Sequence, residues 1–140
     1  MKKIALLFTI VSISFIQKTK AQVPDTLAYL QNIVANKSQY VGQPFSVLYN
    51  NLQIQVKHFW PNTSIHYAKN KEISTQFAYY FPLSQEDIYL TYPCIEIYWQ
   101  TPLNANQSGL LWGNNNGGGW STAVYNFYKN AIIADIKVRE

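Results

Sequence analysis

Strict alternation of side chains between residues 73 and 81 is the feature that most constrains the fold of this chain. One side of the extended backbone carries Ile73, Thr75, Phe77, Tyr79 and Phe81. A period of two predicts a strand. Weaker alternation recurs over residues 54–59, 88–99 and 132–138, and Pro93 indicates a bulge or an edge position in the second of these. In the last of them the inward residues are expected to be Ile132, Ala134, Ile136 and Val138. The sequence therefore predicts an antiparallel sheet of about four to five strands.

Helical periodicity flanks the predicted strands. Asp25 is a favourable N-cap for a helix over residues 26–37, and Pro44 opens a second, shorter helix. Ser121 caps a later helix that is expected to end near Asn130. This order of elements indicates an α+β fold, with two N-terminal helices and one later helix packed on one face of the sheet.

The N-terminus has the pattern of a secretory signal peptide over residues 1–21. Two lysines are followed by an uncharged, largely apolar stretch from Ile4 to Ile16, and small residues precede a cleavage site before Gln22. This stretch is too short for an anchor, because a bilayer-spanning helix needs about 20 apolar residues. Residues 22–140 are then expected to form a single α+β domain that is secreted or periplasmic, without stable insertion in a membrane.

Charge argues against a nucleic-acid partner. The full chain has a net charge of +4, but four of its 11 basic side chains lie in the leader and all 7 acidic side chains follow it. The mature domain is therefore formally neutral. Its basic residues are scattered along the chain, whereas binding to phosphates requires a clustered basic face.

Residues 100–120 lack a regular pattern and are expected to form a long loop rich in Asn, Gly, Gln and Ser. Loops of this length in compact domains are usually functional or disordered. Tryptophans that flank an amide-rich segment can stack on a sugar or anchor a peptide. The candidate binding residues are Trp112, Asn114, Asn115, Asn116 and Trp120. In the alternative interpretation, Trp120 packs on the core and the glycines only provide slack.

Catalytic patterns are weak, and no catalytic residue is assigned. Cys94, the only cysteine, follows a proline in an apolar strand, where burial would make its thiol inert. His58 and His66 would face each other if residues 61–63 formed a hairpin turn. A zinc site needs three or four ligands, so no metal and no other cofactor is expected. Glu96 lies in an aromatic strand, either with a raised pKa or on the solvent face of the sheet.

The segment Val41-Gly42-Gln43-Pro44 starts the second helix, after a first helix and before the predicted strands. In this it resembles small outer-membrane assembly lipoproteins. The resemblance covers roughly a third of the chain, and the cysteine that carries the lipid in that family is absent near the cleavage site. No function is therefore transferred from it.

The sequence thus predicts a secreted bacterial binding module without enzymatic activity, whose partner is an envelope protein or a glycan bound through residues 100–120. Aromatic residues form 16% of the chain and suit either a binding surface or a core. The alternative is a small secreted hydrolase or metal-assisted enzyme that uses His58, His66 and Glu96. A structural subunit of the envelope is a third possibility.

The predicted cleavage can be checked directly. When the chain is expressed with its own N-terminus in a Gram-negative host, we expect the exported protein to begin at Gln22, because Thr19 and Ala21 are small residues at the −3 and −1 positions. Intact-mass measurement of the periplasmic and medium fractions should show the loss of residues 1–21. Exported protein that retains these residues would contradict the prediction.

Overall fold

The computed structural model describes residues 25–63, 68–80 and 92–140. The elements in these ranges are α1 (Thr26–Ala35), η1 (Lys37–Gln39), α2 (Phe45–Asn51), β1 (His58–Thr63), β2 (Lys71–Ala78), β3 (Cys94–Asn104), α4 (Ala105–Asn114), α5 (Thr122–Tyr128) and β4 (Ile133–Arg139). The four strands form one antiparallel sheet in chain order. The predicted α+β fold is therefore confirmed. The predicted signal peptide and its cleavage site lie outside the described residues.

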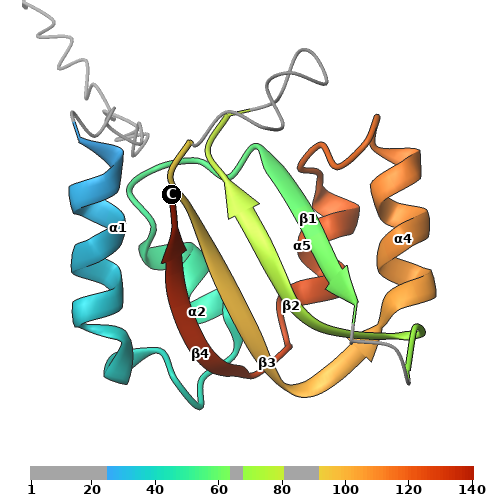
Figure 1. Cartoon of the computed structure of the whole chain (residues 1–140), viewed down its shortest axis with the longest axis horizontal. Coiled ribbons are helices and arrows are strands. Elements are labelled where there is room, and N and C mark those ends of the chain that lie inside the picture. Colours follow the sequence, from blue (N-terminus) through green and yellow to red (C-terminus); the bar gives the residue numbers. More distant parts are fainter. Residues whose placement is uncertain (1–24, 64–67, 81–91) are drawn as a thin grey trace, which may run out of the picture.

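The helices lie behind the sheet and along its two sides (Figure 1). In that view α2 and α5 lie behind the strands, α1 runs beside β4, and α4 runs beside β1. The near face of the sheet has no described helix in front of it. None of the described helices is long and apolar enough to span a bilayer. Among the described elements, helices therefore cover one face of the sheet, and the opposite face, which no described helix covers, is termed the open face.

The covered face encloses an aromatic core. Phe45 of α2 stacks on Phe77 of β2 with ring centroids 4.8 Å apart, and Trp99 of β3 stacks on Tyr128 of α5 at 5.5 Å. The side chains of Phe45, Phe77 and Tyr128 are fully buried. Because each aromatic ring removes a large apolar area from water, these contacts between helices and strands are a major source of stability.

The predicted alternation holds only in part on β2 and on β4. Ile136 of β4 is fully buried as expected, whereas Ile73 of β2 is only half-buried between the buried residues Glu72 and Ser74. Thr75 and Phe77 are fully buried as expected. On β4 the prediction placed Ile132 and Ala134 inward, which is wrong, because Ile133 is fully buried and Ala134 is exposed. The register between β3 and β4 shifts just before the pair of Trp99 and Ile133. Such an irregularity moves the inward positions by one residue.

The hairpin turn considered for residues 61–63 does not form, because β1 continues to Thr63. His58 lies opposite Ala78 of β2, so the proposed hairpin that would place it opposite His66 does not form. His66 itself lies outside the described residues. Pro61 is tolerated within β1 because this strand lies at an edge of the sheet, where a backbone N–H is not required on the outer side.

The prediction of a structureless loop over residues 100–120 is also wrong. β3 extends to Asn104, and α4 follows at once. The side chain of Asn104 accepts hydrogen bonds from the backbone N–H groups of Asn106 and Gln107, at 3.0 and 3.2 Å. This N-cap starts a helix in a segment whose composition suggested a loop. The part of the chain that the structure describes therefore has two later helices, α4 and α5, where one was expected.

The glycine run after α4 pairs with the outer edge of β1. The backbone N–H of Phe59 donates to the Gly118 carbonyl at 2.9 Å, and the Trp120 N–H donates to the Lys57 carbonyl at 3.0 Å. Gly118 has a φ of +103°. A Cβ atom at this position would lie 2.5 Å from the Phe59 carbonyl oxygen. Only glycine fits here, so the run protects a strand edge and is not slack.

We expect Gly118→Ala to destabilise the protein by about 2 to 4 kcal/mol, because it combines a strained φ with a backbone clash. Gly113→Ala is the matched control, since Gly113 is helical and a Cβ there has nothing within 4 Å. The control should be neutral or stabilising by up to about 1 kcal/mol. Urea unfolding monitored by tryptophan fluorescence measures both, and equal effects would refute the interpretation.

Candidate functional site

An apolar groove of about 250 Å³ lies between the edge strand β1 and the helix α4. Its lining residues come from these two elements and are Trp60, Pro61, Thr63, Ala105, Gly109 and Trp112. The rings of Trp60 and Trp112 meet edge to face, with centroids 5.4 Å apart. Nothing lies within 4 Å of a Cβ position at Gly109, so the absent side chain leaves this wall open.

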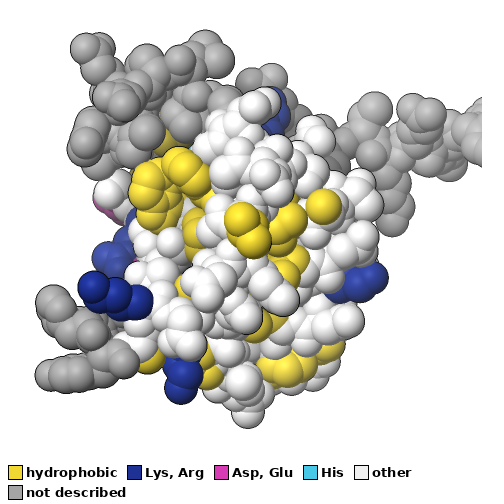
Figure 2. All heavy atoms as spheres, turned by 90° about the vertical axis from the view of Figure 1, so that its right-hand side faces the viewer, with side chains coloured by type: hydrophobic (Ala, Val, Ile, Leu, Met, Phe, Trp, Pro, Cys, Tyr) yellow, Lys and Arg dark blue, Asp and Glu magenta, His cyan; other side chains and the backbone are white. Residues whose placement is uncertain are grey.

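The surroundings of the groove are uncharged and partly apolar. None of the described residues that line it carries a charge. Trp60 is 38% exposed, and Leu110, which does not line the groove, is 68% exposed. Figure 2 views the molecule from the side of α4 and shows separate hydrophobic patches, with basic side chains toward the margins. The groove therefore suits an uncharged ligand that can contact aromatic rings.

The open face of the sheet continues from the groove as two rows of side chains that cross the strands. The register gives one row as Trp60, Gln76, Glu96 and Lys137, and the next as Asn62, Ser74, Tyr98 and Asp135. Trp60 therefore lines the groove and also begins a row of polar residues. The groove and the polar face form one continuous surface.

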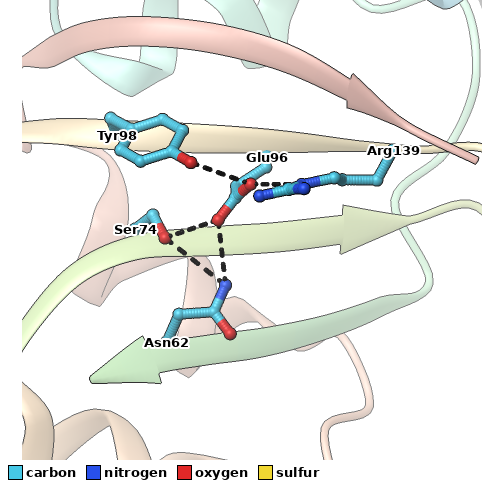
Figure 3. Close-up of polar contacts among 5 residues, drawn as sticks. All are labelled: Asn62, Ser74, Glu96, Tyr98 and Arg139. Atoms are coloured by element: carbon cyan, nitrogen blue, oxygen red, sulfur yellow. Dashed lines mark hydrogen bonds and ion pairs between the residues drawn. The ribbon is translucent and has the colours of Figure 1, made fainter. Parts of the chain in front are cut away.

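Glu96 organises the polar face (Figure 3). The Arg139 Nε donates to Glu96 Oε2 at 2.6 Å, and the Ser74 hydroxyl donates to Oε1 at 2.8 Å. Tyr98 donates to Oε2 at 3.1 Å. Burial alone would raise the pKa of Glu96, but these donors outweigh it and lower the pKa. The raised pKa that the sequence left open is therefore absent, and Glu96 is a satisfied carboxylate on the open face.

His58 holds the glycine run against β1. Its Nε2 atom lies 2.8 Å from the Gly117 carbonyl oxygen. Because a carbonyl oxygen only accepts, Nε2 carries a proton and donates this hydrogen bond. Burial lowers the pKa of His58, which favours the neutral ring. The hydrogen bond directs His58 toward the outer edge of β1, whereas Glu96 binds residues of β2, β3 and β4.

A second carboxyl group, that of Glu72, is fully buried on the covered side of the sheet. The hydroxyl groups of Thr75 and Tyr128 both donate to its Oε1 atom. Trp99 in turn donates from its indole N–H to the Thr75 hydroxyl at 2.9 Å. Burial raises the pKa of Glu72, although its hydrogen-bond donors oppose the effect. Glu72 therefore joins β2 to α5 inside the core.

The structure separates the predicted binding residues. Trp112 lines the groove, as described above. Trp120 instead packs against the core, with its ring 5.7 Å from that of Phe77, and donates from its indole N–H to the Tyr49 hydroxyl at 3.1 Å. The flanking tryptophans therefore face different surroundings, and Trp120 takes the packing role that the sequence had left as the alternative.

The predicted asparagines terminate α4. Asn114 is the last helical residue and is exposed, and the Asn115 side chain donates to the Leu111 carbonyl at 2.7 Å. Asn116 has a φ of +53°, in the left-handed region that asparagine tolerates. Of the predicted binding residues, Trp112 alone contributes to the groove, and the asparagines shape the turn behind it.

Sequence reasoning missed the other lining residues of the groove. Trp60 and Pro61 were assigned to a turn, although proline is compatible with an edge strand. Ala105 and Ser108, both buried, and Trp112 recur at helical spacing after the cap at Asn104. This helical spacing could have predicted α4, but the surrounding Asn and Gly residues indicated a loop.

The remaining nucleophile and metal candidates give no site. Cys94 is a free thiol, and burial raises its pKa to about 11, as expected for an unreactive cysteine. Within the described ranges, no group of three or more His, Cys, Asp or Glu side chains is arranged to hold a metal ion.

Comparisons with protein-family models, with curated proteins and with solved structures gave no match for this chain. A fold alone does not define a function, which resides in the geometry and chemistry of a site. The function must therefore be inferred from the groove and the polar face themselves.

The two carboxyl groups predict opposite pH dependences. The lowered pKa of Glu96 means that its stabilisation is lost as the pH falls below the ordinary glutamate pKa of about 4.3. The raised pKa of Glu72 means that the folded state retains this proton longer, so stability falls as the pH rises above about 4.3.

We therefore expect the stability difference between wild type and Glu96→Gln to shrink in acid. For Glu72→Gln, wild type should lose stability relative to the variant as the pH rises. Urea unfolding between about pH 3 and pH 8 measures both differences, and each variant is the control for the other. Parallel curves for the two variants would show that these assignments are wrong.

Proposed function

We propose that this protein is an exported, non-enzymatic binding module that takes its ligand in the groove between β1 and α4. The observation that carries the proposal is the edge-to-face contact of Trp60 and Trp112 in the lining of an uncharged groove, whose wall is left open at Gly109. Exposed tryptophan is enriched at binding sites, because its ring buries a large area while its N–H remains available for a polar contact. The export follows from the signal-peptide pattern of residues 1–21.

The two walls of the groove are held in place by backbone hydrogen bonds, which favours binding. β1 pairs along its length with β2, and the glycine run pairs with its outer edge. At the start of α4 the Ala105 N–H donates to the Asn70 carbonyl at 2.9 Å, and the Ser108 side chain is fully buried. A site that is already formed loses little conformational entropy when a ligand binds.

The polar groups of the open face support binding more than catalysis. General acid–base catalysis needs a group whose pKa lies near the working pH. The pKa of Glu96 is lowered and its carboxylate forms an ion pair with Arg139 at 2.6 Å. In the competing proposal of a hydrolase that uses His58, His66 and Glu96, the carboxylate of Glu96 therefore does not meet this requirement, and the Nε2 atom of His58 is engaged with the Gly117 carbonyl at 2.8 Å.

The groove can be filled by a single substitution with a matched control. Gly109→Leu places a side chain in the groove, whereas Gly113→Leu lies on the same helix and does not line it. At both positions a Cβ has nothing within 4 Å, and both changes raise helix propensity by about 0.5–1 kcal/mol. The immobilised wild-type protein and both variants are exposed to bacterial envelope extract. Retained material is analysed for protein and for carbohydrate.

We expect a component that wild type and Gly113→Leu retain equally and that Gly109→Leu loses at least tenfold, because the added side chain occupies the site. If wild type and Gly109→Leu retain the same material, the groove is not the binding site and the proposal fails. The carbohydrate and protein analyses of the retained component identify its class separately.

A further inference from the structure

The polar face beside Trp60 contains amide groups whose hydrogen-bonding capacity is unused. Gln76 lies between Trp60 and Glu96 in its row, and no described residue forms a hydrogen bond with its side chain. Asn62 donates to Ser74 and Glu96 at 3.4 and 3.3 Å, both long, and no described residue donates to its Oδ1. Each amide offers donors and acceptors to a ligand on this face.

Charges on the same face are compensated within the protein. Glu96 pairs with Arg139 at 2.6 Å, and Asp135 pairs with Lys37 at 2.5 Å. The Lys137 ammonium lies 4.6 Å from the centroid of the Tyr98 ring. A ligand carboxylate or ammonium would compete with the two ion pairs, whereas a neutral ligand leaves them intact, so this surface favours a neutral ligand.

Part of each described sheet edge is closed to an added peptide strand. On β1 the amide of Phe59 already donates to Gly118, and Pro61 has no N–H. On β4 the Ile133 N–H donates to the Gln43 carbonyl at 3.0 Å, and the Gly42 N–H donates to the Ile133 carbonyl at 2.8 Å. Strand addition requires free N–H and C=O groups along an edge. The described edges therefore disfavour an extended peptide as the ligand.

The groove has room for a ring-sized group and lacks the length for a helix. Its volume is about 250 Å³, below the range of about 300–1,000 Å³ typical of small-molecule sites. An amphipathic peptide helix needs a longer apolar groove for anchors at several successive turns. An aromatic wall next to free amides instead matches a molecule with an apolar C–H face and many hydroxyl groups.

We infer that the ligand is an uncharged saccharide. One sugar ring lies against Trp60, and the adjacent sugar rings form hydrogen bonds with the amides of Gln76 and Asn62. The inference rests on the proposed function and names the ligand class of the same site. The sugar ring presents C–H groups to the indole of Trp60, and its hydroxyl groups both donate to and accept from the amides. Figure 2 shows hydrophobic patches on the side of α4, and Figure 3 shows Asn62 among the polar side chains that cross the strands.

The test is isothermal titration of the purified protein with three neutral hexasaccharides, cellohexaose, chitohexaose and mannohexaose. A heparin hexasaccharide serves as the charged comparison. We expect at least one neutral probe to bind with a Kd below about 1 mM, and to bind more tightly than heparin.

Two variants locate the saccharide. Trp60→Ala should weaken binding at least tenfold, because it removes the stacking surface. Gln76→Ala should weaken it about two- to tenfold, the effect of one or two hydrogen bonds. Leu110→Ala and Gln31→Ala are matched controls, since both residues are exposed and lie outside the site, and they should leave the Kd unchanged. Near-ultraviolet circular dichroism confirms that each variant is folded.

Failure to bind any neutral probe, or equal affinity of wild type and Trp60→Ala, would overturn the saccharide inference. The proposed function fails independently, when filling the groove at Gly109 leaves retention from envelope extract unchanged. A retained component that is protein without carbohydrate would keep the binding groove and refute the saccharide.

Discussion

The close approach of the Gly118 backbone to β1 is the constraint on which the groove depends. At this point three parts of the chain meet, and a Cβ atom would lie within 2.7 Å of His58, Phe59 and Trp112 alike. The Phe59 and His58 hydrogen bonds hold the glycine run at the strand. Because this run directly follows α4, the contact fixes the helix beside β1 and sets the separation between Trp60 and Trp112. The interaction that protects the strand edge therefore also forms the site.

The two buried carboxyl groups lie on opposite faces of the sheet and have different surroundings. Glu72 faces the core, where hydroxyl donors satisfy one oxygen and burial favours the protonated form. Glu96 faces outward, where Arg139 stabilises its negative charge. An unpaired buried charge is costly, so each group requires its own partners. Since the Glu96 pair already spans β3 and β4, it braces the open face and leaves the amides of Asn62 and Gln76 for a ligand.

Local signals predicted the fold class and most elements near the chain ends. Asp25 and Ser121 cap helices as expected, because a cap depends only on residues within one turn. The predictions failed where contacts between distant parts of the chain determine the local structure. The composition of residues 100–120 is typical of a loop. A helix forms there because Asn104 caps α4 and the buried face of α4 packs beside β1. The extension of β1 through Pro61 depends on its position at a sheet edge, which pattern alone does not reveal. The two walls of the groove are these two wrongly predicted segments. The sequence therefore identified Trp112 as a site residue and missed Trp60.

Much of the aromatic surplus of the sequence lies in the core, which is one of the two roles that the sequence left open. Trp99 and Trp120 pack with Phe77 and Tyr128 inside the fold, and their indole N–H groups reach protein hydroxyls. Trp60 is exposed and contacts Trp112 beside a groove. A tryptophan that is needed only for packing is most stable when its ring is covered and its N–H is paired. The indole of Trp60 remains 38% exposed beside a concave, uncharged surface, so packing within the fold does not account for all of its area, and this is the area that the proposed ligand would cover.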